Sequence, residues 1–137
     1  MNAGAAVVQL LKADGLVQEL PGVEIYGDLP RGRISDRLGP TIVVAANGGG
    51  SLGPGARSYI PWQVTRLDIY CYSRTAYEAA DLNQRVYAAL TQMQRTRYGD
   101  TLLRDAIVSG GPIQSRDADA DWTCVLSVYD VSATAAA

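Results

Sequence analysis

Residues 59–90 join an alternating strand directly to an amphipathic helix, and this unit limits what the chain can fold into. The strand runs from Trp62 to Tyr72, with one face of Leu67, Ile69 and Cys71 and another of Arg66, Asp68, Tyr70 and Tyr72. A period of two is typical of a strand that lays one face on a hydrophobic core. The other face is polar but rich in tyrosine, which favours a contact surface.

The residues after this strand predict a helix over residues 75–94. Thr75 and Glu78 have the spacing of a capping box, which satisfies backbone N–H groups at a helix start. Asp81 and Arg85 can form an i,i+4 ion pair on the outer side of the helix. Apolar residues recur at spacings of three and four on the other side, namely Ala79, Leu82, Val86, Leu90 and Met93. This stripe needs a sheet to cover.

The remaining predicted elements are shorter. Asn2 predicts the N-cap of a helix over residues 3–13, with Gly15 as its stop, and a further turn as far as Leu20 stays open. Apolar runs predict strands at residues 23–26, 41–46, 105–108 and 122–131, with a Gly-Gly-Pro break after the third. Two segments rich in Gly and Pro, residues 27–40 and 47–60, are expected to be loops.

The order of these elements predicts an α+β fold. We expect a small antiparallel or mixed β-sheet packed by a long amphipathic helix, with a short N-terminal helix. A chain of 137 residues is expected to form a single domain, residues 1–137. Within it, residues 47–60 are expected to be a long flexible loop and residues 132–137 a frayed tail.

The residue types present argue against catalysis and against a metal site. The chain has no histidine, which removes the commonest general base and the commonest metal ligand. The Gly-rich segment after Asn47 lacks the lysine of a phosphate-binding loop. Asp117, Asp119 and Asp121 lack the glycine and glutamate that complete a calcium loop. We therefore expect no enzymatic activity, no cofactor and no metal.

Charge and hydropathy limit the partners. The net charge of −2 does not attract nucleic acid to the protein as a whole. No apolar run approaches the ~18 residues that span a bilayer, so we expect no membrane partner and synthesis in a cytoplasm. Cys71 and Cys124 both lie in apolar strand patterns, and we expect both thiols to be buried and reduced.

Arginine and tyrosine side chains supply the candidate interface. Arginine suits interfaces because its planar fork pairs two oxygens, although a GC-rich genome would also raise its frequency. Arg31, Arg33 and Arg37 lie in one loop together with Asp28 and Asp36. A solvated loop therefore stays an alternative to an intersubunit ion-pair surface. The predicted contact residues lie on the two loops and the long strand: Arg57, Tyr59, Arg66, Tyr70, Tyr72, Arg31, Arg33 and Arg37.

The layout of the chain resembles that of the tail-terminator and tail-completion proteins of long-tailed phages. The resemblance rests first on the sequence from Val23 to Pro30, V-E-I-Y-G-D-L-P, and on the apolar strand that follows Pro40. It rests also on the sequence from Arg66 to Tyr72, R-L-D-I-Y-C-Y, and on the Ala-rich helix after it. These patterns of layout cover residues 3–131; the Gly-rich loop and the acidic turn at 117–121 have no counterpart in the resemblance.

The resemblance implies a structural role in a virion. Members of that family form hexameric rings that cap the tail tube and join it to the head connector. It therefore implies a homo-oligomeric ring at the tail neck, with the tail tube protein and a head connector or head-closure protein as partners, and with DNA only passing through the lumen.

Two alternatives remain open from the sequence. The first is a neighbouring role in the same joint, as a head-closure or adaptor protein of the neck. The second is a small binding module outside any phage, in which the loop at residues 47–60 serves as a lid over a ligand.

Overall fold

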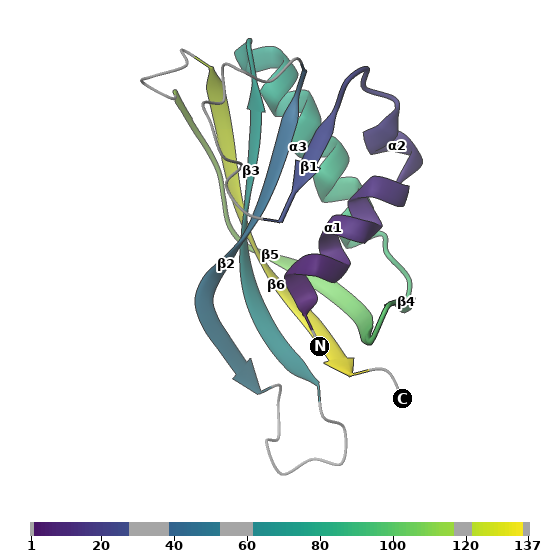
Figure 1. Cartoon of the computed structure of the whole chain (residues 1–137). Coiled ribbons are helices and arrows are strands. Elements are labelled where there is room, and N and C mark those ends of the chain that lie inside the picture. Colours follow the sequence, from purple (N-terminus) through teal and green to yellow (C-terminus); the bar gives the residue numbers. More distant parts are fainter. Residues whose placement is uncertain (1, 28–38, 53–61, 117–121, 136–137) are drawn as a thin grey trace.

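The structure is a computed structural model that describes residues 2–27, 39–52, 62–116 and 122–135, with only the backbone described for residues 47–52. The elements in chain order are α1 (Ala3–Ala13), α2 (Gly15–Gln18), β1 (Glu24–Tyr26), β2 (Thr41–Leu52), β3 (Gln63–Ser73), α3 (Ala76–Thr91), β4 (Thr96–Tyr98), β5 (Thr101–Arg116) and β6 (Thr123–Ala135). Their arrangement is shown in Figure 1.

A single curled sheet of six strands holds all the described strands, in the order β1-β2-β3-β6-β5-β4. β1 pairs in parallel with β2, and every other neighbouring pair is antiparallel. The four long strands, β2, β3, β6 and β5, form the centre of the sheet. β1 and β4 are short and lie at its two ends.

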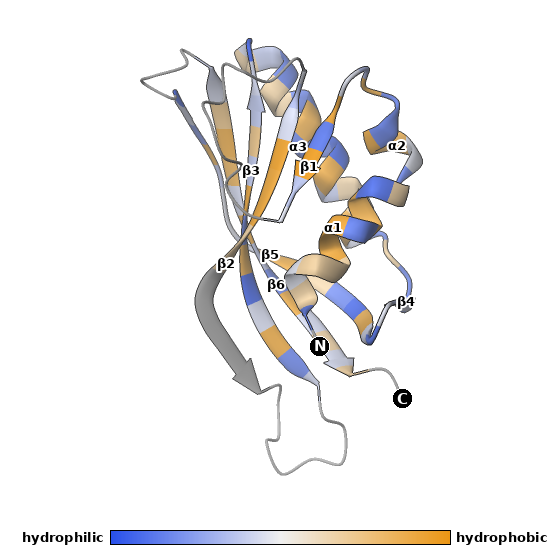
Figure 2. Cartoon of the chain, viewed as in Figure 1, coloured by the Kyte–Doolittle hydropathy of each residue, from blue (hydrophilic) through white to orange (hydrophobic). Residues whose placement is uncertain are grey.

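The helices lie together on one face of the sheet (Figure 1). Their apolar sides point toward the strands, as the hydropathy colouring in Figure 2 shows for α1 and α3. Leu11 of α1, Leu82 of α3 and Ile69 of β3 all have no exposed surface and belong to one continuous core. Burial of each such side chain contributes about 1.5–3 kcal/mol, so this face holds the domain together.

The helix starts are fixed by the side chains that the sequence indicates. The side-chain oxygen of Asn2 accepts a hydrogen bond from the backbone N–H of Ala5 at 3.0 Å, which confirms the N-cap of α1. Thr75 accepts in the same way from the N–H of Glu78 at 3.2 Å. The Glu78 carboxylate, however, accepts from the Ser73 hydroxyl at 2.7 Å, so half of the expected capping box is replaced by a bond to β3.

α1 ends at Ala13, as predicted, and a second short helix follows it. Gly15 begins α2, where the Asp14 side chain accepts a hydrogen bond from the N–H of Val17 at 3.0 Å. Arg85 of α3 then fixes α2, since its guanidinium contacts Glu19 at 3.0 Å as well as Asp81 at 3.0 Å. The predicted Asp81–Arg85 pair is therefore confirmed as part of a larger contact between two helices.

The predicted fold, a small sheet packed by a long amphipathic helix, is wrong in its proportions. The described chain is mostly strand, the sheet is large and curled, and its cover is divided among short helices of 11, 4 and 16 residues. The class is still broadly α+β. The error arose because β2 and β5 continue through Gly-rich sequence that turn signals alone assign to loops.

Several segments that the sequence assigns to a break, a loop or a frayed end are strand in the structure. β5 runs on through Gly110, Gly111 and Pro112, and its register against β6 shifts at that point. β2 runs on to Leu52, so residues 47–52 are strand, and the rest of the predicted flexible loop lies outside the described residues. The predicted frayed tail also differs from the structure, because β6 continues to Ala135 and Ala133 is fully buried.

The two described ends of the chain meet at Thr101. The backbone N–H of Asn2 donates to the Thr101 hydroxyl at 2.9 Å, and Thr101 is the register partner of Ala135. The start of α1 and the end of β6 therefore lie at the same end of the sheet. No helix in the described ranges is long and apolar enough to cross a membrane.

Candidate interaction surface

The face of the sheet turned away from α1 and α3, here called the helix-free face, is the candidate functional surface. Register partners in an antiparallel pair point to the same side of a sheet, so rows of paired residues define this face. One row runs Val43, Tyr70, Leu126 and Ile113; the next runs Ala45, Asp68, Val128 and Gly110; a third runs Arg66, Asp130 and Ile107. The rows pass from apolar to charged along the strands.

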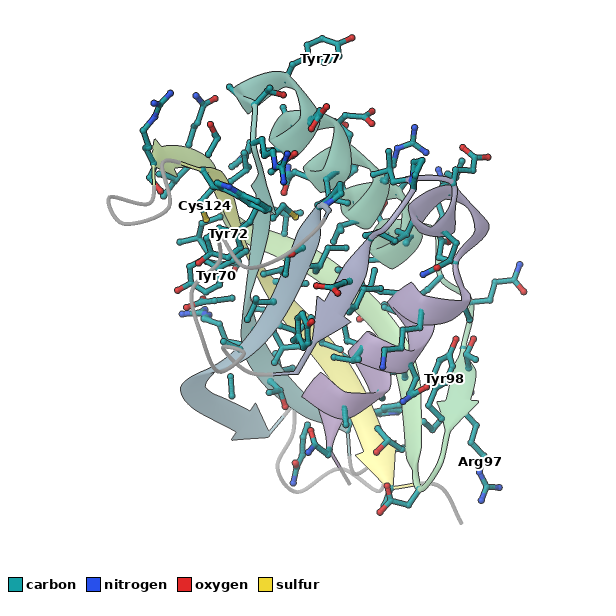
Figure 3. The ribbon with its side chains drawn as sticks, turned by 45° about the horizontal axis from the view of Figure 1, so that its top comes forward. Tyr70, Tyr72, Tyr77, Arg97, Tyr98 and Cys124 are labelled. Atoms are coloured by element: carbon teal, nitrogen blue, oxygen red, sulfur yellow. The ribbon has the colours of Figure 1, made fainter. Side chains whose placement is uncertain are left out.

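The apolar end of this face carries a second, smaller core. Tyr72, Trp122 and Cys124 are buried there together with Val43, apart from the core beneath the helices. The rings of Tyr70 and Tyr72 stack with centroids 6.2 Å apart and planes 19° from parallel. Figure 3 shows both tyrosines and Cys124 gathered on the side of the sheet away from α1.

The two predicted contact tyrosines therefore differ in access. Tyr72 is only 8% exposed, so it packs within the protein and offers little contact area to a partner. Tyr70 is half-buried, and burial followed by the nearby Asp68 raises the pKa of its hydroxyl. Tyr70 stays neutral at physiological pH and can present its ring and hydroxyl to a partner.

The charged end of the face carries an ion pair between two strands. The Arg66 guanidinium donates to the Asp130 carboxylate at 3.0 Å across β3 and β6. This hydrogen bond, and then the charge of Asp130, raise the pKa of Arg66. The Arg66 side chain is 51% exposed, so a partner could compete for it, but the pair as it stands carries no net charge.

Two exposed isoleucines on β5 were not among the predicted contact residues. Ile107 is 65% exposed and Ile113 is 57% exposed, and both belong to the rows of the helix-free face. Large exposed apolar side chains on one face mark contact surfaces more than single ones do. The alternation at 105–108 was a usable signal, but the predicted break at Gly110 removed Ile113 from any strand.

The other predicted contact residues are not placed. Arg57 and Tyr59 fall in residues 53–61, and Arg31, Arg33 and Arg37 fall in residues 28–38; both segments lie outside the described residues. The structure therefore brings together Arg66, Tyr70 and Tyr72 on β3, and leaves the five loop residues as predictions.

The cysteines lie on opposite faces of β3 and β6. Cys71 belongs to the core beneath the helices and Cys124 to the smaller core, and both are free thiols and buried, as predicted. Burial, and then the nearby Cys124, raise the pKa of the Cys71 thiol far above its ordinary range. A thiol held protonated in this way is a poor nucleophile. Within the described part of the chain, no three acidic or cysteine side chains gather as metal ligands would.

Comparison with known proteins supports the fold. No protein-family model matches the chain, and no curated protein matches it in sequence. Among solved structures, the chain is similar to a chain of the "Virion of native gene transfer agent (GTA) particle", with a TM-score of 0.70 and 19% sequence identity. The match covers 96% of this chain and 93% of that chain. This protein therefore shares, over nearly its full described length, the fold of a chain from a virion particle.

Proposed function

We propose that this protein is a structural component of a phage-like virion. The observation that carries the proposal is the likeness to a chain of a gene transfer agent virion, which extends over 96% of this chain and includes no large unmatched region. A likeness to one domain of a large enzyme would leave much of the other chain unmatched, whereas here 93% of that chain is covered.

Within the virion, we assign the protein to the tail neck as a tail terminator. The support is the sequence layout described above, from the Val23–Pro30 segment to the Ala-rich helix α3. In this role the protein forms a ring, hexameric in the family that it resembles, on the end of the tail tube. Its partners are the tail tube protein on one side and the head connector on the other, and DNA passes through the lumen.

The chemistry of the helix-free face supports a contact role. Arg66 and Asp130 on this face pair with each other across β3 and β6, so a partner surface need not supply compensating charge for either of them. Its apolar side chains include Ile107, Ile113 and the half-buried Tyr70. A surface of this kind suits stable association with protein, where charges are depleted at the core of the contact and aromatic residues are enriched.

The experiment is deletion of the encoding gene from its source genome, with complementation by the intact gene. Particles are purified, the protein is sought by mass spectrometry, and tails are imaged by electron microscopy. We expect the protein in intact particles, a ring of density at the head end of the tail, and unjoined heads and tails in the deletion. Absence of the protein from purified particles overturns the virion role; density only at the distal tail tip overturns the neck assignment.

A further inference from the structure

Among the residues that the structure describes, the sheet has two long edges without a paired strand over part of their length. β1 pairs with residues 41–43 of β2, and β4 pairs with residues 101–103 of β5. No described strand pairs with the outer edge of β2 over residues 44–52, or with that of β5 over residues 104–115. Open edges of this kind present rows of backbone donors and acceptors that another strand can use.

These two open stretches lie at the same height along the strands. Following the register across the sheet, Ala46 of β2 pairs with Leu67, Leu67 with Tyr129, and Tyr129 with Val108 of β5. A second row joins Gly50, Thr65, Val131 and Ala106. Between the two rows β2 advances four residues while β5 advances two, because the register of β2 against β3 shifts between Ala46 and Gly50. The edge of one copy can therefore meet the opposite edge of another at the same level, with a bulge in β2 between Ala46 and Gly50.

The unpaired stretches of β2 and β5 begin and end in the same register rows of the sheet. At one end, Leu52 lies in the row of Leu103, where β4 begins to cover β5. At the other end, β1 covers β2 up to Val43, and β5 reaches the register shift that contains Pro112, which has no N–H to donate. Each short edge strand therefore leaves the part of the opposite edge that a neighbour would need.

Strand direction fits the same contact. β2, β3, β6 and β5 each run antiparallel to the next, so β2 and β5 point in opposite directions. Strand direction alternates across these four strands. When β5 of one copy lies beside β2 of the next, the two strands are therefore antiparallel as well. A head-to-tail contact of this kind forms a ring where the rotation between copies closes, and a helical filament where it does not.

We propose that β5 of one copy pairs antiparallel with the open edge of β2 in the next copy, with Val108 facing Ala46 and Ala106 facing Gly50 on either side of the bulge in β2. This inference deepens the proposed function and rests on its self-assembly into a ring, because it names the strands that hold neighbouring subunits together.

The surroundings of both edges suit this partner. Beside the open edge of β2, a hollow of about 630 Å³ lies between Val44, Ala46, Leu67 and the first residues of α1, with room for side chains from a neighbour. β2 also contains Gly48, Gly49 and Gly50, and glycine in a strand permits close approach of another backbone. On β5, Ile107 is 65% exposed where a protected edge would carry lysine.

A cysteine pair tests the proposed register in assembled particles. Ala46→Cys and Val108→Cys are combined in one chain, and particles carrying it are oxidised and run on a non-reducing gel. Facing strand positions bring Cβ atoms to within about 5.5 Å, which suits a disulfide. We expect a ladder of cross-linked subunits. The parent chain, with its two buried cysteines, and each single variant are the controls and should stay monomeric on the gel.

The outcomes separate this inference from the virion role. If the double variant is present in particles but forms no cross-link, the strand pairing is overturned while the virion role stands. If either single variant cross-links to itself, the contact is a symmetric edge pair and the head-to-tail arrangement is overturned. Absence of even the parent chain from particles overturns the virion role and the ring together.

A matched pair of charge substitutions gives an independent test. Ile107→Lys places a charge inside the proposed contact, and Tyr77→Lys places the same charge on α3, away from both sheet edges. Ile107 is 65% exposed and Tyr77 is 86% exposed, so both variants should fold like the parent by circular dichroism. We expect at least tenfold less Ile107→Lys than Tyr77→Lys protein per particle. Equal incorporation of the two variants overturns the inference.

Discussion

The hydroxyl of Ser127 donates a hydrogen bond of 2.9 Å to the side-chain carbonyl of Asn83, within the core that joins β6 to α3. Both residues are buried, at 2% and 5% exposure. The bond therefore fixes the position of the helix on the central strand pair. It also satisfies two polar groups that would otherwise lie unpaired among apolar side chains.

Asn83→Ala should lower the free energy of unfolding by about 1–3 kcal/mol, because the Ser127 hydroxyl loses its acceptor in a dry environment. The double variant with Ser127→Ala should cost less than the sum of the two single changes, since no polar group is then left unpaired. Urea denaturation measures all three. Gln84→Ala, on the exposed side of the same helix, is the control and should stay within about 0.5 kcal/mol of the parent. Strict additivity would contradict the coupling.

Thr75→Ala should destabilise the protein by about 1 kcal/mol, because the N–H of Glu78 loses the acceptor that begins α3. Thr75→Ser keeps a hydroxyl in the same place and should recover most of the loss. Thermal melts followed by circular dichroism compare the three proteins. Equal melting temperatures for Thr75→Ala and the parent would show that the Glu78–Ser73 contact suffices to start the helix.

Gly39→Ala should destabilise the protein, because an added Cβ would lie 2.5 Å from the carbonyl oxygen of Gly22 and force the entrances to β1 and β2 apart. Gly15→Ala adds the same methyl group in the first position of α2, where nothing lies within 4 Å. Gly15→Ala should be neutral or should stabilise the protein by up to about 1 kcal/mol, because alanine lowers the conformational entropy of the unfolded chain. Denaturation midpoints that move in the same direction for both would contradict the packing at Gly39.

Cys71 should make stability depend on pH in mildly alkaline solution. Its pKa is raised in the folded protein, so above about pH 8.5 the unfolded chain loses this proton while the folded chain keeps it. The contribution of the Cys71 thiol to the free energy of unfolding is complete below about pH 8.5 and falls by about 1.4 kcal/mol per pH unit above it. Tyr129, whose pKa is also raised by burial, adds to the fall only above about pH 10.

Cys71→Ala removes this thiol and should flatten the stability curve between about pH 8.5 and 10, while lowering stability at pH 7 through the lost packing. Urea titrations at several pH values measure both effects. An unchanged slope in the variant would show that Cys71 does not carry the pH dependence.

Much of the helical layer could be predicted from the sequence. Asn2 and Thr75 each predict a helix start, because their side chains can cap nearby backbone N–H groups. The apolar stripe that contains Leu82 identifies the buried side of α3. The alternation in β3 likewise places Leu67 and Tyr70 on opposite faces. These signals depend only on residues close together in the sequence, so they can be interpreted without knowledge of the rest of the fold.

The extent of the sheet could not be predicted, for a physical reason. Gly110, Gly111 and Pro112 break strands in isolation, but β6 supplies a long template that holds β5 extended on both sides of a bulge. The burial of Tyr72 was hidden in the same way, because its cover comes from Trp122 and Cys124, fifty residues or so along the chain. Pairing between distant strands decides both features, and a local pattern does not contain it.

The meeting of Asn2 and Ala135 at Thr101 has a practical consequence for imaging. A small fluorescent protein or gold-binding tag attached before Asn2 or after Ala135 would sit on the same rim of every subunit. In a closed ring of identical copies, the two tagged proteins would decorate one side only, and the same side. If the proposed ring forms, such a pair of labels would show which side of it faces the tail, even in images too coarse to trace a strand.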